Sequence, residues 1–408
     1  MQVSHSDPRG SLTGVRVVDL SRVLAGPLCS QMLADHGAQV VKVEPPAGDD
    51  TRAWGPPFVG ENMSAYFSAL NRNKANLCLD LSVAEGQAVL ADLLRDADVL
   101  VENFKSGTLG RWGFAEETLR ERYPRLVHCR ITGFGVDGPM GAMPGYDAVV
   151  QAYSGLMSIN GEEEGPPLRI GVPVVDMVTG AYAATGILLA LLDRARTGLG
   201  QLVDSTLIDT AVSLLHPHSS AHLADGRIPA RTGSAHPTIA PYDTFPAADG
   251  PIFIGVGNDQ QFRRFLAVLG ADHLAEDPRF STNADRLANL GELRPLLDEC
   301  VCRYDRHSLA KELLAQGVPA SAVNNVAEAL SDPHVLHRRM VAEENGEPVV
   351  GIPIKLSRSP GSIRAAPRDR GADTRRVLAG LGYSTERVDA LVNAGVAQVP
   401  RAEVDHPL

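Results

Sequence analysis

One acidic residue stands alone in the segment GVPVVDMVTG, residues 171–180. Asp176 follows an apolar approach and precedes the apolar run MVTGAYAATGILLALL. Carboxylates are seldom set among apolar neighbours unless they have a partner or a chemical task. The dipole at the start of a helix would favour the ionised, nucleophilic form, whereas burial would raise the pKa of Asp176. The segment therefore predicts either a nucleophile or a structural carboxylate that caps the helix or joins a buried ion pair.

A few other side chains have types that could serve a binding site. Asn103 ends the strand-like segment VENF, where open α/β sheets bind ligands, although asparagine also forms turns. Lys105 and Arg111 could bind phosphate groups or remain solvated charges. Tyr146 could form a hydrogen bond to a reacting group or pack in the core. His236, in the loop GSAHPTIAP, could contact a substrate or be an ordinary loop histidine.

The first 135 residues alternate between strand-like and helix-like segments. β-branched runs predict the strands, and apolar residues at helical spacing predict the helices, of which the second has Ser82 as its expected N-cap. This alternation predicts an α/β fold with a parallel, doubly wound sheet covered by helices. The predicted strands are 14–20, 38–44, 77–81, 98–104 and 125–135, and the predicted helices are 26–37 and 82–97.

A helical middle follows, with a strand predicted over 199–207. On the helix after Asp176, the small residues Gly180, Ala184 and Gly186 would let another backbone approach closely. The uncharged run 177–192 is short for a membrane span, so we expect a buried helix.

A second, smaller domain is predicted after the linker at 225–241, which has no periodicity. It begins with a hairpin that turns at Asp249 and Gly250 and continues with helices over about 259–340. The tail predicts a strand in VVGIPIKLS, residues 349–357, and two short helices.

Composition excludes several classes of function. Lysine and arginine number 38 against 49 aspartates and glutamates, which argues against a general nucleic-acid binder. The five cysteines form no metal-ligand spacing, so we expect no metal and buried thiols in a cytoplasmic protein. No apolar signal segment opens the chain. The turn SRVLAGPLCSQ after the first strand lacks the three glycines of a dinucleotide site, and Pro27 removes a backbone donor. A nicotinamide-dependent oxidoreductase is therefore a distant alternative.

An ordered set of segments resembles the class III CoA-transferases, the CaiB/BaiF family. The matches include GVRVVDLSRVLAGPLCSQMLADHGAQVVKVEPP, DDTRAWGPP, LNRNKANLCLDL, ADVLVENFKSGTLGRWGF, PGYDAVVQAYSGLM, VDMVTGAYA and GVPASAVNNVAEALSDP, and they extend over nearly the whole chain. The resemblance implies a Rossmann-like large domain built from both chain ends, a small α+β domain, and two ring-like subunits interlocked in a homodimer. The domains would be 1–224, 225–345 and, returning to the large domain, 346–408.

The resemblance also implies site residues. Asp176 would be the catalytic nucleophile, with coenzyme A thioesters as substrates and no permanently bound cofactor. Pro45 stands where some members have an arginine near the nucleotide, and the C-terminal RGADTRRVL replaces the usual Gly-Glu-His-Thr pattern. The residues implied to contact CoA are Leu24, Ala25, Leu79, Asp80, Leu81, Ser82, Asn103, Phe104, Lys105, Arg111, Tyr146 and Asp147.

Transfer of CoA between carboxylates is close to energy-neutral, so one nucleophilic carboxylate suffices without metal, ATP or redox chemistry. The middle and C-terminal segments look most like the branch that uses succinyl-CoA as donor and glutarate, itaconate or hydroxymethylglutarate as acceptor. His236, Arg52, Arg169 and Arg231 are candidates for substrate contacts, since a distal carboxylate needs a cation or several donors.

Two alternatives stay open at this point. An α-methylacyl-CoA racemase of the same superfamily would have a His-Asp pair where this chain has Tyr146 and Asp147, and tyrosine is a poor base at neutral pH. A non-catalytic CoA-binding protein would leave Asp176 without a task. Partners other than a second copy and small molecules, such as nucleic acid or a membrane, are not expected.

Overall fold

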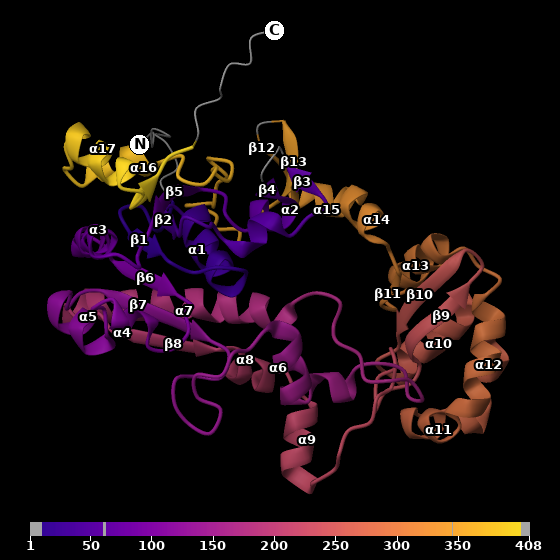
Figure 1. Ribbon diagram of the computed structural model, residues 1–408. Helices are drawn as coiled ribbons and strands as arrows, with labels where there is room; N and C mark the ends of the chain where they lie inside the picture. Colours follow the sequence, from indigo (N-terminus) through magenta and orange to yellow (C-terminus); the bar gives the residue numbers. More distant parts are fainter. Residues whose placement is uncertain (1–9, 60–62, 345, 401–408) are drawn as a thin grey trace. The chain divides into compact units, whose positions relative to one another are not determined.

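The structure, a computed structural model, describes residues 10–59, 63–344 and 346–400. The chain divides into two compact units (Figure 1). The first consists of the chain up to Ser154, Ile170–Ser219 and the chain from His337 onward. The second consists of Gly155–Arg169 and Ser220–Leu336. The first unit therefore combines segments from both halves of the sequence.

A seven-stranded sheet forms the centre of the first unit. Its strands lie in the order β14-β5-β2-β1-β6-β7-β8, and every neighbouring pair is parallel except β14 with β5. The strand order reverses between β1 and β6, which opens a crevice at their carboxyl ends. The strands are β1 (Arg16–Asp19), β2 (Gln39–Glu44), β5 (Lys74–Leu79), β6 (Val99–Glu102), β7 (Val127–Thr132), β8 (Leu202–Thr206) and β14 (Ala397–Gln398).

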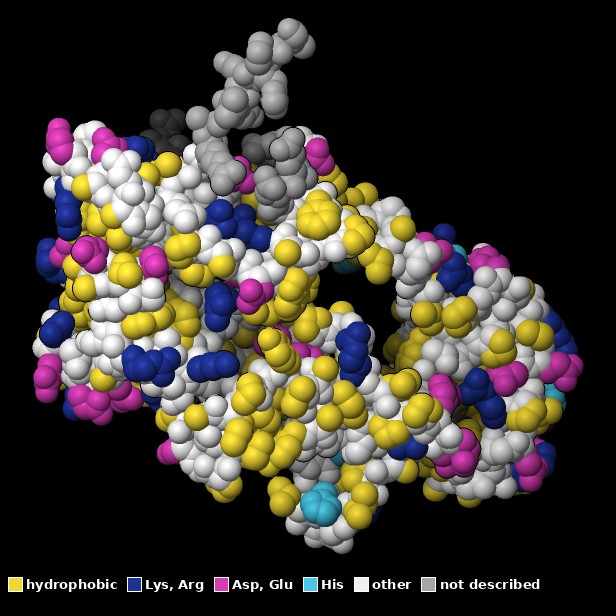
Figure 2. Space-filling model, in the orientation of Figure 1, with side chains coloured by type: hydrophobic (Ala, Val, Ile, Leu, Met, Phe, Trp, Pro, Cys, Tyr) yellow, Lys and Arg dark blue, Asp and Glu magenta, His cyan; other side chains and the backbone are white. Residues whose placement is uncertain are grey.

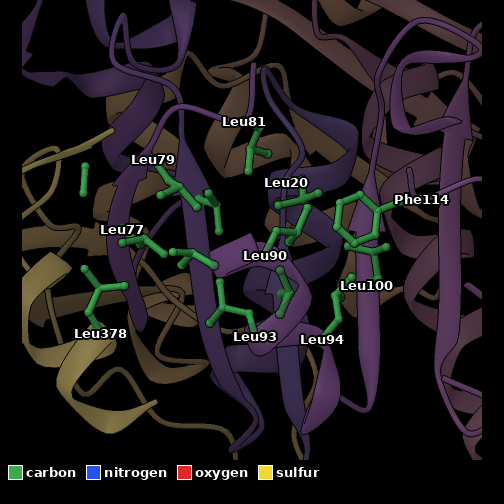
Figure 3. Packing of buried hydrophobic residues seen from close by; sticks show 14 of the residues in the cluster. Leu20, Leu77, Leu79, Leu81, Leu90, Leu93, Leu94, Leu100, Phe114 and Leu378 are labelled. Carbon is green, nitrogen blue, oxygen red and sulfur yellow. The ribbon is translucent and has the colours of Figure 1, made fainter. Parts of the chain in front are cut away.

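Helices cover both faces of this sheet, as the alternation of the sequence predicts. Helices α1 (Ala25–Asp35) and α7 (Val174–Thr197) pack on one face against valines of β1, β2 and β6. On the other face, α3 (Ala84–Arg95), α16 (Thr374–Gly380) and α17 (Thr385–Asn393) share a core with the sheet. Figure 3 shows this second layer, in which Leu90 and Leu94 of α3 lie close to Leu20 and Leu100. The doubly covered sheet fixes the positions of the loops at its carboxyl edge.

Shorter elements complete the first unit. Two small hairpins, β3 with β4 and β12 with β13, lie outside the main sheet. The elements are η1 (Asp50–Ala53), β3 (Phe58–Val59), β4 (Met63–Ser64), α2 (Ala65–Ser68), α4 (Thr108–Arg111), α5 (Glu116–Arg122), α6 (Asp147–Ser154), α8 (Leu207–Ser213), β12 (Val341–Glu344) and β13 (Glu347–Val350).

The second unit has its own core around the antiparallel sheet β11-β10-β9. The predicted hairpin of β9 and β10 is confirmed, but its turn is at Ala248 and Asp249 instead of Asp249 and Gly250, because Gly250 pairs with Ala247. The elements within or at the edge of this unit are η2 (Leu156–Ile159), α9 (His218–Asp225), β9 (Tyr242–Ala247), β10 (Gly250–Gly255), α10 (Asp259–Val268), η3 (Asp272–Leu274), η4 (Pro278–Phe280), α11 (Asn283–Ala288), α12 (Leu290–Val301), α13 (Arg306–Ala315), β11 (Ala320–Ala322), α14 (Val326–Ser331) and α15 (Pro333–His337).

Charged side chains are buried inside the first unit between β1, β2 and β5. Lys42 Nζ lies 3.0 Å from Asp49 Oδ2 and donates to the Ser21 carbonyl at 2.8 Å. Lys74 Nζ lies 3.2 Å from Asp19 Oδ2. Burial would raise the pKa of Asp19, but the two ammonium groups and neighbouring serine hydroxyls hold that pKa below its ordinary value. Burial lowers the pKa of Lys74 to about 8. The network ties the end of β1 to the loop after β2.

The small residues of α7 serve packing within the chain. A Cβ on Gly180 would lie 2.6 Å from the Ala25 carbonyl oxygen of α1, and one on Gly186 would lie 2.6 Å from a methyl group of Val203 in β8. The close backbone approach that the sequence predicts therefore occurs between Gly180 and α1, whereas Gly186 makes room for the Val203 side chain of β8.

Four local predictions are wrong. Cys302 is exposed, although buried thiols are expected from the sequence. Helix α3 begins after Val83, and the Ser82 hydroxyl donates to Asp80 instead of capping the helix. The tail strand ends at Val350, because it pairs only with the short β12. Helix α7 is buried on one face only, since Tyr182, Leu189 and Leu192 are 50%, 62% and 71% exposed. By length and composition α7 is also the one helix in the described part of the chain that could cross a membrane.

Candidate active site

A cavity of about 210 Å³ lies at the carboxyl edge of the sheet, around the point where the strand order reverses. The turn after β1, the loop after β6 and the loop after β7 all contribute to its wall. Asp176 lines this cavity from the first turn of α7. Of the residues predicted to contact CoA, the lining includes Leu24, Ala25, Asn103, Phe104, Lys105 and Tyr146.

Asp147 caps the helix that carries Asp176. Helix α7 begins after Pro173, whose side chain offers no hydrogen-bond acceptor. The Asp147 Oδ2 atom accepts hydrogen bonds from the backbone N–H groups of Val175 at 2.8 Å and Asp176 at 3.1 Å. Its other oxygen accepts from Gln151 Nε2 at 2.5 Å. Asp147 thus takes the capping role that the sequence left open for Asp176, and it fixes the position of the Asp176 backbone.

The carboxyl group of Asp176 has an unusual pKa. Burial, and secondarily the negative charge of Asp147, raise the pKa of Asp176 to about 7. The two carboxylates therefore have different roles. Asp147 caps the helix and accepts from three hydrogen-bond donors, while Asp176 faces the cavity. A carboxyl group with a pKa near neutrality and access to a cavity is typical of a functional site.

The remaining predicted CoA contacts lie outside the wall of this cavity. Leu79 and Leu81 belong to the apolar core beneath α3. Asp80 accepts hydrogen bonds from the backbone and hydroxyl of Ser82 and so forms a local turn. Arg111 is exposed, and its guanidinium donates to Thr108 Oγ1 at 3.0 Å. Contacts of this group with CoA remain predictions.

The four candidates for substrate contacts have different surroundings. Arg52 forms two hydrogen bonds to the buried Glu44, from Nε at 2.8 Å and from Nη2 at 2.7 Å. Arg231 donates to three backbone carbonyls within 162–165. The His236 Nδ1 atom accepts from the Thr238 backbone at 3.2 Å. His236, Arg231 and Arg169 belong to the second unit. Arg52 and Arg231 are thus held by partners of their own.

Sequence reasoning missed two charged residues that line the cavity, Arg22 and Asp50. Arg22 lies in the turn that follows β1, three residues after its last residue Asp19, and Asn103 directly follows the end of β6. The rule that selected Asn103, ligand binding at the carboxyl ends of strands, also applies to Arg22. The signal was therefore present in the segment DLSRVLAGP.

Comparisons with known proteins agree with this site. A model of CoA-transferase family III matches residues 12–374. A succinate–glutarate CoA-transferase of Agrobacterium fabrum is 43% identical over 381 residues, which cover 91% of this chain and 95% of that protein. An acetyl-CoA:oxalate CoA-transferase of Acetobacter aceti is 38% identical over 384 residues, which cover 93% and 98%. The crystal structure of a CaiB/BaiF family protein from Brucella suis has a TM-score of 0.86 and 41% identity, and the match covers 91% of this chain and all of that one. The resemblance seen in the sequence is confirmed: the chain belongs to CoA-transferase family III.

Proposed function

We propose that the protein transfers CoA from succinyl-CoA to a dicarboxylate of the glutarate, itaconate or hydroxymethylglutarate type, with Asp176 as the nucleophile. The observation that carries this proposal is the Asp176 carboxyl group, which lines a cavity at the ligand-binding edge of the sheet and has a pKa of about 7. At that pH about half of the carboxyl groups are ionised and the ionised fraction grows as the pH rises, and the group is more basic than an ordinary aspartate. Both properties favour attack on a thioester carbonyl.

The reaction needs four acyl-transfer steps and no other reagent. Asp176 attacks the donor thioester, the C–S bond breaks, and CoA leaves as a thiolate while a mixed anhydride forms on the aspartyl group. The thiolate then attacks the aspartyl carbonyl, which releases the donor carboxylate and leaves an aspartyl-CoA thioester. The acceptor carboxylate then attacks the aspartyl-CoA thioester, which releases the CoA thiolate and forms a second mixed anhydride. The thiolate attacks the acceptor carbonyl of this anhydride, which releases the new acyl-CoA and restores the Asp176 carboxylate. Electrons and atoms balance at each step, since one carboxylate enters for each that leaves.

The wall of the cavity supports these steps. Asn103 and Tyr146 line the same cavity as Asp176, and Tyr146 is 65% exposed. We assign CoA binding to Leu24, Ala25, Asn103, Phe104, Lys105 and Tyr146, with Arg111 and 79–82 extending the site toward the nucleotide. The order of the parallel strands matches that of doubly wound nucleotide-binding sheets, which supports a Rossmann-like large domain. The chemistry uses soluble substrates, which supports a cytoplasmic enzyme.

The substrate proposal rests on relatives and has a direct test. The relative from Agrobacterium fabrum is named for succinate and glutarate and the one from Acetobacter aceti for oxalate, and all three compounds are dicarboxylates. We expect transfer from succinyl-CoA to glutarate, itaconate or hydroxymethylglutarate with a kcat/KM at least about 10-fold above that for acetate or butyrate. A panel of carboxylic acids, with acyl-CoA products separated by chromatography, measures this. Comparable turnover with butyrate would refute the dicarboxylate proposal.

We also propose that the protein is an interlocked homodimer. Tyr182, Leu189 and Leu192 form an exposed apolar stripe on α7, and Figure 2 shows further apolar side chains gathered over α6 and α8. Exposed apolar patches of this kind are typical of interfaces between subunits. We expect sedimentation at nanomolar concentration to give a dimer and Leu189→Asp to reduce dimer stability. A folded, fully active monomer would contradict this proposal.

A further inference from the structure

Arg22 has the position expected of a residue that recognises a substrate. It lines the same cavity as Asp176 and lies in the turn after β1, three residues beyond Asp19. Among the described residues, its guanidinium has one charged neighbour: Nη1 lies 3.7 Å from Asp50 Oδ2, which is beyond hydrogen-bond distance. The side chain of Asp50 is 66% exposed and also lines the cavity. The guanidinium therefore retains most of its five donors for another anion.

The backbone that carries Arg22 is held rigidly. The Asn103 Oδ1 atom accepts from the Arg22 N–H at 2.9 Å, and its Nδ2 atom donates to the Arg22 carbonyl at 2.7 Å. The next residue, Val23, has a φ of 71°, a left-handed conformation that β-branched residues rarely adopt. Its N–H donates to Asp49, which is itself paired with the buried Lys42. Asn103, Asp49 and Lys42 are buried or half-buried, and together they keep this turn in a strained conformation. The turn is therefore a rigid support for the Arg22 side chain.

The other candidate cations are less suited to the same task. Arg52 is occupied by Glu44, and moving it would leave a buried carboxylate without its partner. Arg231 anchors the backbone of 162–165 in the second unit. Lys105 also lines the cavity but offers a point charge, whereas the planar guanidinium of Arg22 matches the two oxygens of a carboxylate.

We propose that Arg22 is the specificity-determining residue that binds the carboxylate at the far end of the acyl group. This inference rests on the proposed function. A succinyl donor and a glutarate acceptor share one feature, a free carboxylate a few bonds from the reacting carbonyl, so one guanidinium serves both halves of the reaction. Asp50 is the resting partner of Arg22, and the substrate carboxylate takes its place during binding.

The test compares substrates with and without the far carboxylate. In Arg22→Ala we expect KM for succinyl-CoA and for glutarate to rise roughly 10- to 100-fold, because a charge-assisted, bidentate contact is lost. KM for butyryl-CoA and pentanoate, which have a methyl group in place of that carboxylate, should change less than about 3-fold. Arg22→Lys should recover part of the selectivity. Asp50→Asn should lower KM for glutarate, because it removes the competing anion.

Arg95→Ala is the matched control, since Arg95 is exposed on α3 and pairs only with Asp92 among the described residues. Its kinetics should equal those of the wild type. An equal rise in KM for succinyl-CoA and butyryl-CoA in Arg22→Ala would assign Arg22 to CoA itself and overturn the inference. Unchanged selectivity would overturn it as well. Equal use of glutarate and pentanoate by the wild type would instead refute the dicarboxylate proposal together with the inference. Failure of the proposed function is therefore seen in the wild type, and failure of the inference alone is seen only in Arg22→Ala.

Discussion

Asp176→Asn is expected to abolish CoA transfer while leaving the protein folded. The neutral amide keeps the size of the side chain but is a far weaker nucleophile, so kcat should fall by about 10³-fold or more. The kcat of Asp176→Ala should fall by the same factor. The measurement is a steady-state assay with succinyl-CoA and glutarate, on protein whose mass confirms that the asparagine has not deamidated. CoA binding should persist, since Asn103, Tyr146 and the turn at Leu24 remain in place.

The stability of Asp176→Asn provides the control for folding, and the direction of its difference from the wild type follows from the pKa of Asp176. Burial and Asp147 raise the pKa of Asp176 to about 7, above the value of 3.8 expected for an unfolded chain. The wild type therefore loses stability as pH rises from about 4 through 7, whereas the asparagine variant does not. This difference corresponds to at most about 4 kcal/mol, and about 2 kcal/mol is expected because the carboxyl group is only partly buried. Thermal unfolding should show the variant more stable than the wild type at pH 8 and equal to it near pH 4.

Lys42→Met is expected to destabilise the protein strongly. Lys42 is fully buried, lies 3.0 Å from Asp49, and contributes to the low pKa values of Asp49 and Asp19. Its removal leaves a buried carboxylate without a cation, which costs about 3 to 5 kcal/mol of unfolding free energy. The loss should shrink toward pH 4, because burial without Lys42 raises the pKa of Asp49 and the carboxyl group of the variant becomes protonated. Denaturant titration at pH 8 and pH 4 measures both effects.

Two controls sharpen this prediction. The double variant Lys42→Met/Asp49→Asn removes both charges and should be more stable than Lys42→Met alone. Arg196→Ala removes an exposed cation that pairs with Asp193 on α7 and should cost less than about 1 kcal/mol. A loss below about 1 kcal/mol in Lys42→Met would show that the buried network does not hold the end of β1.

Much of the fold follows from patterns that are local in the sequence. The β-branched runs at 14–20 and 38–44 contain β1 and β2, and the alternation with helices predicts the parallel order of the sheet. The position of Asp176 at the start of α7 follows from the apolar run behind it. Each of these features depends on residues that are close together in the chain, so periodicity suffices to predict it.

The features that the sequence did not reveal depend on contacts between distant residues. Asp147 caps a helix that begins 27 residues later. Lys42 appears in the sequence as one polar residue in a strand, and its partner Asp49 lies in the following loop. The small residues of α7 predict a close approach but cannot say whether α1 or a second chain makes it. Side-chain chemistry alone does not choose among such partners.

Chemical trapping of the aspartyl intermediate tests the central claim most directly. The wild-type enzyme is incubated with succinyl-CoA and hydroxylamine, and the protein is digested for mass spectrometry. Hydroxylamine attacks the activated aspartyl carbonyl of the anhydride or thioester, so the account predicts a hydroxamate on Asp176, dependent on succinyl-CoA and absent from Asp176→Asn. A hydroxamate on Asp147 would contradict the assignment of Asp176 as the nucleophile. An active enzyme whose Asp176 stays unmodified, and which keeps full activity after hydroxylamine is added, would contradict it as well.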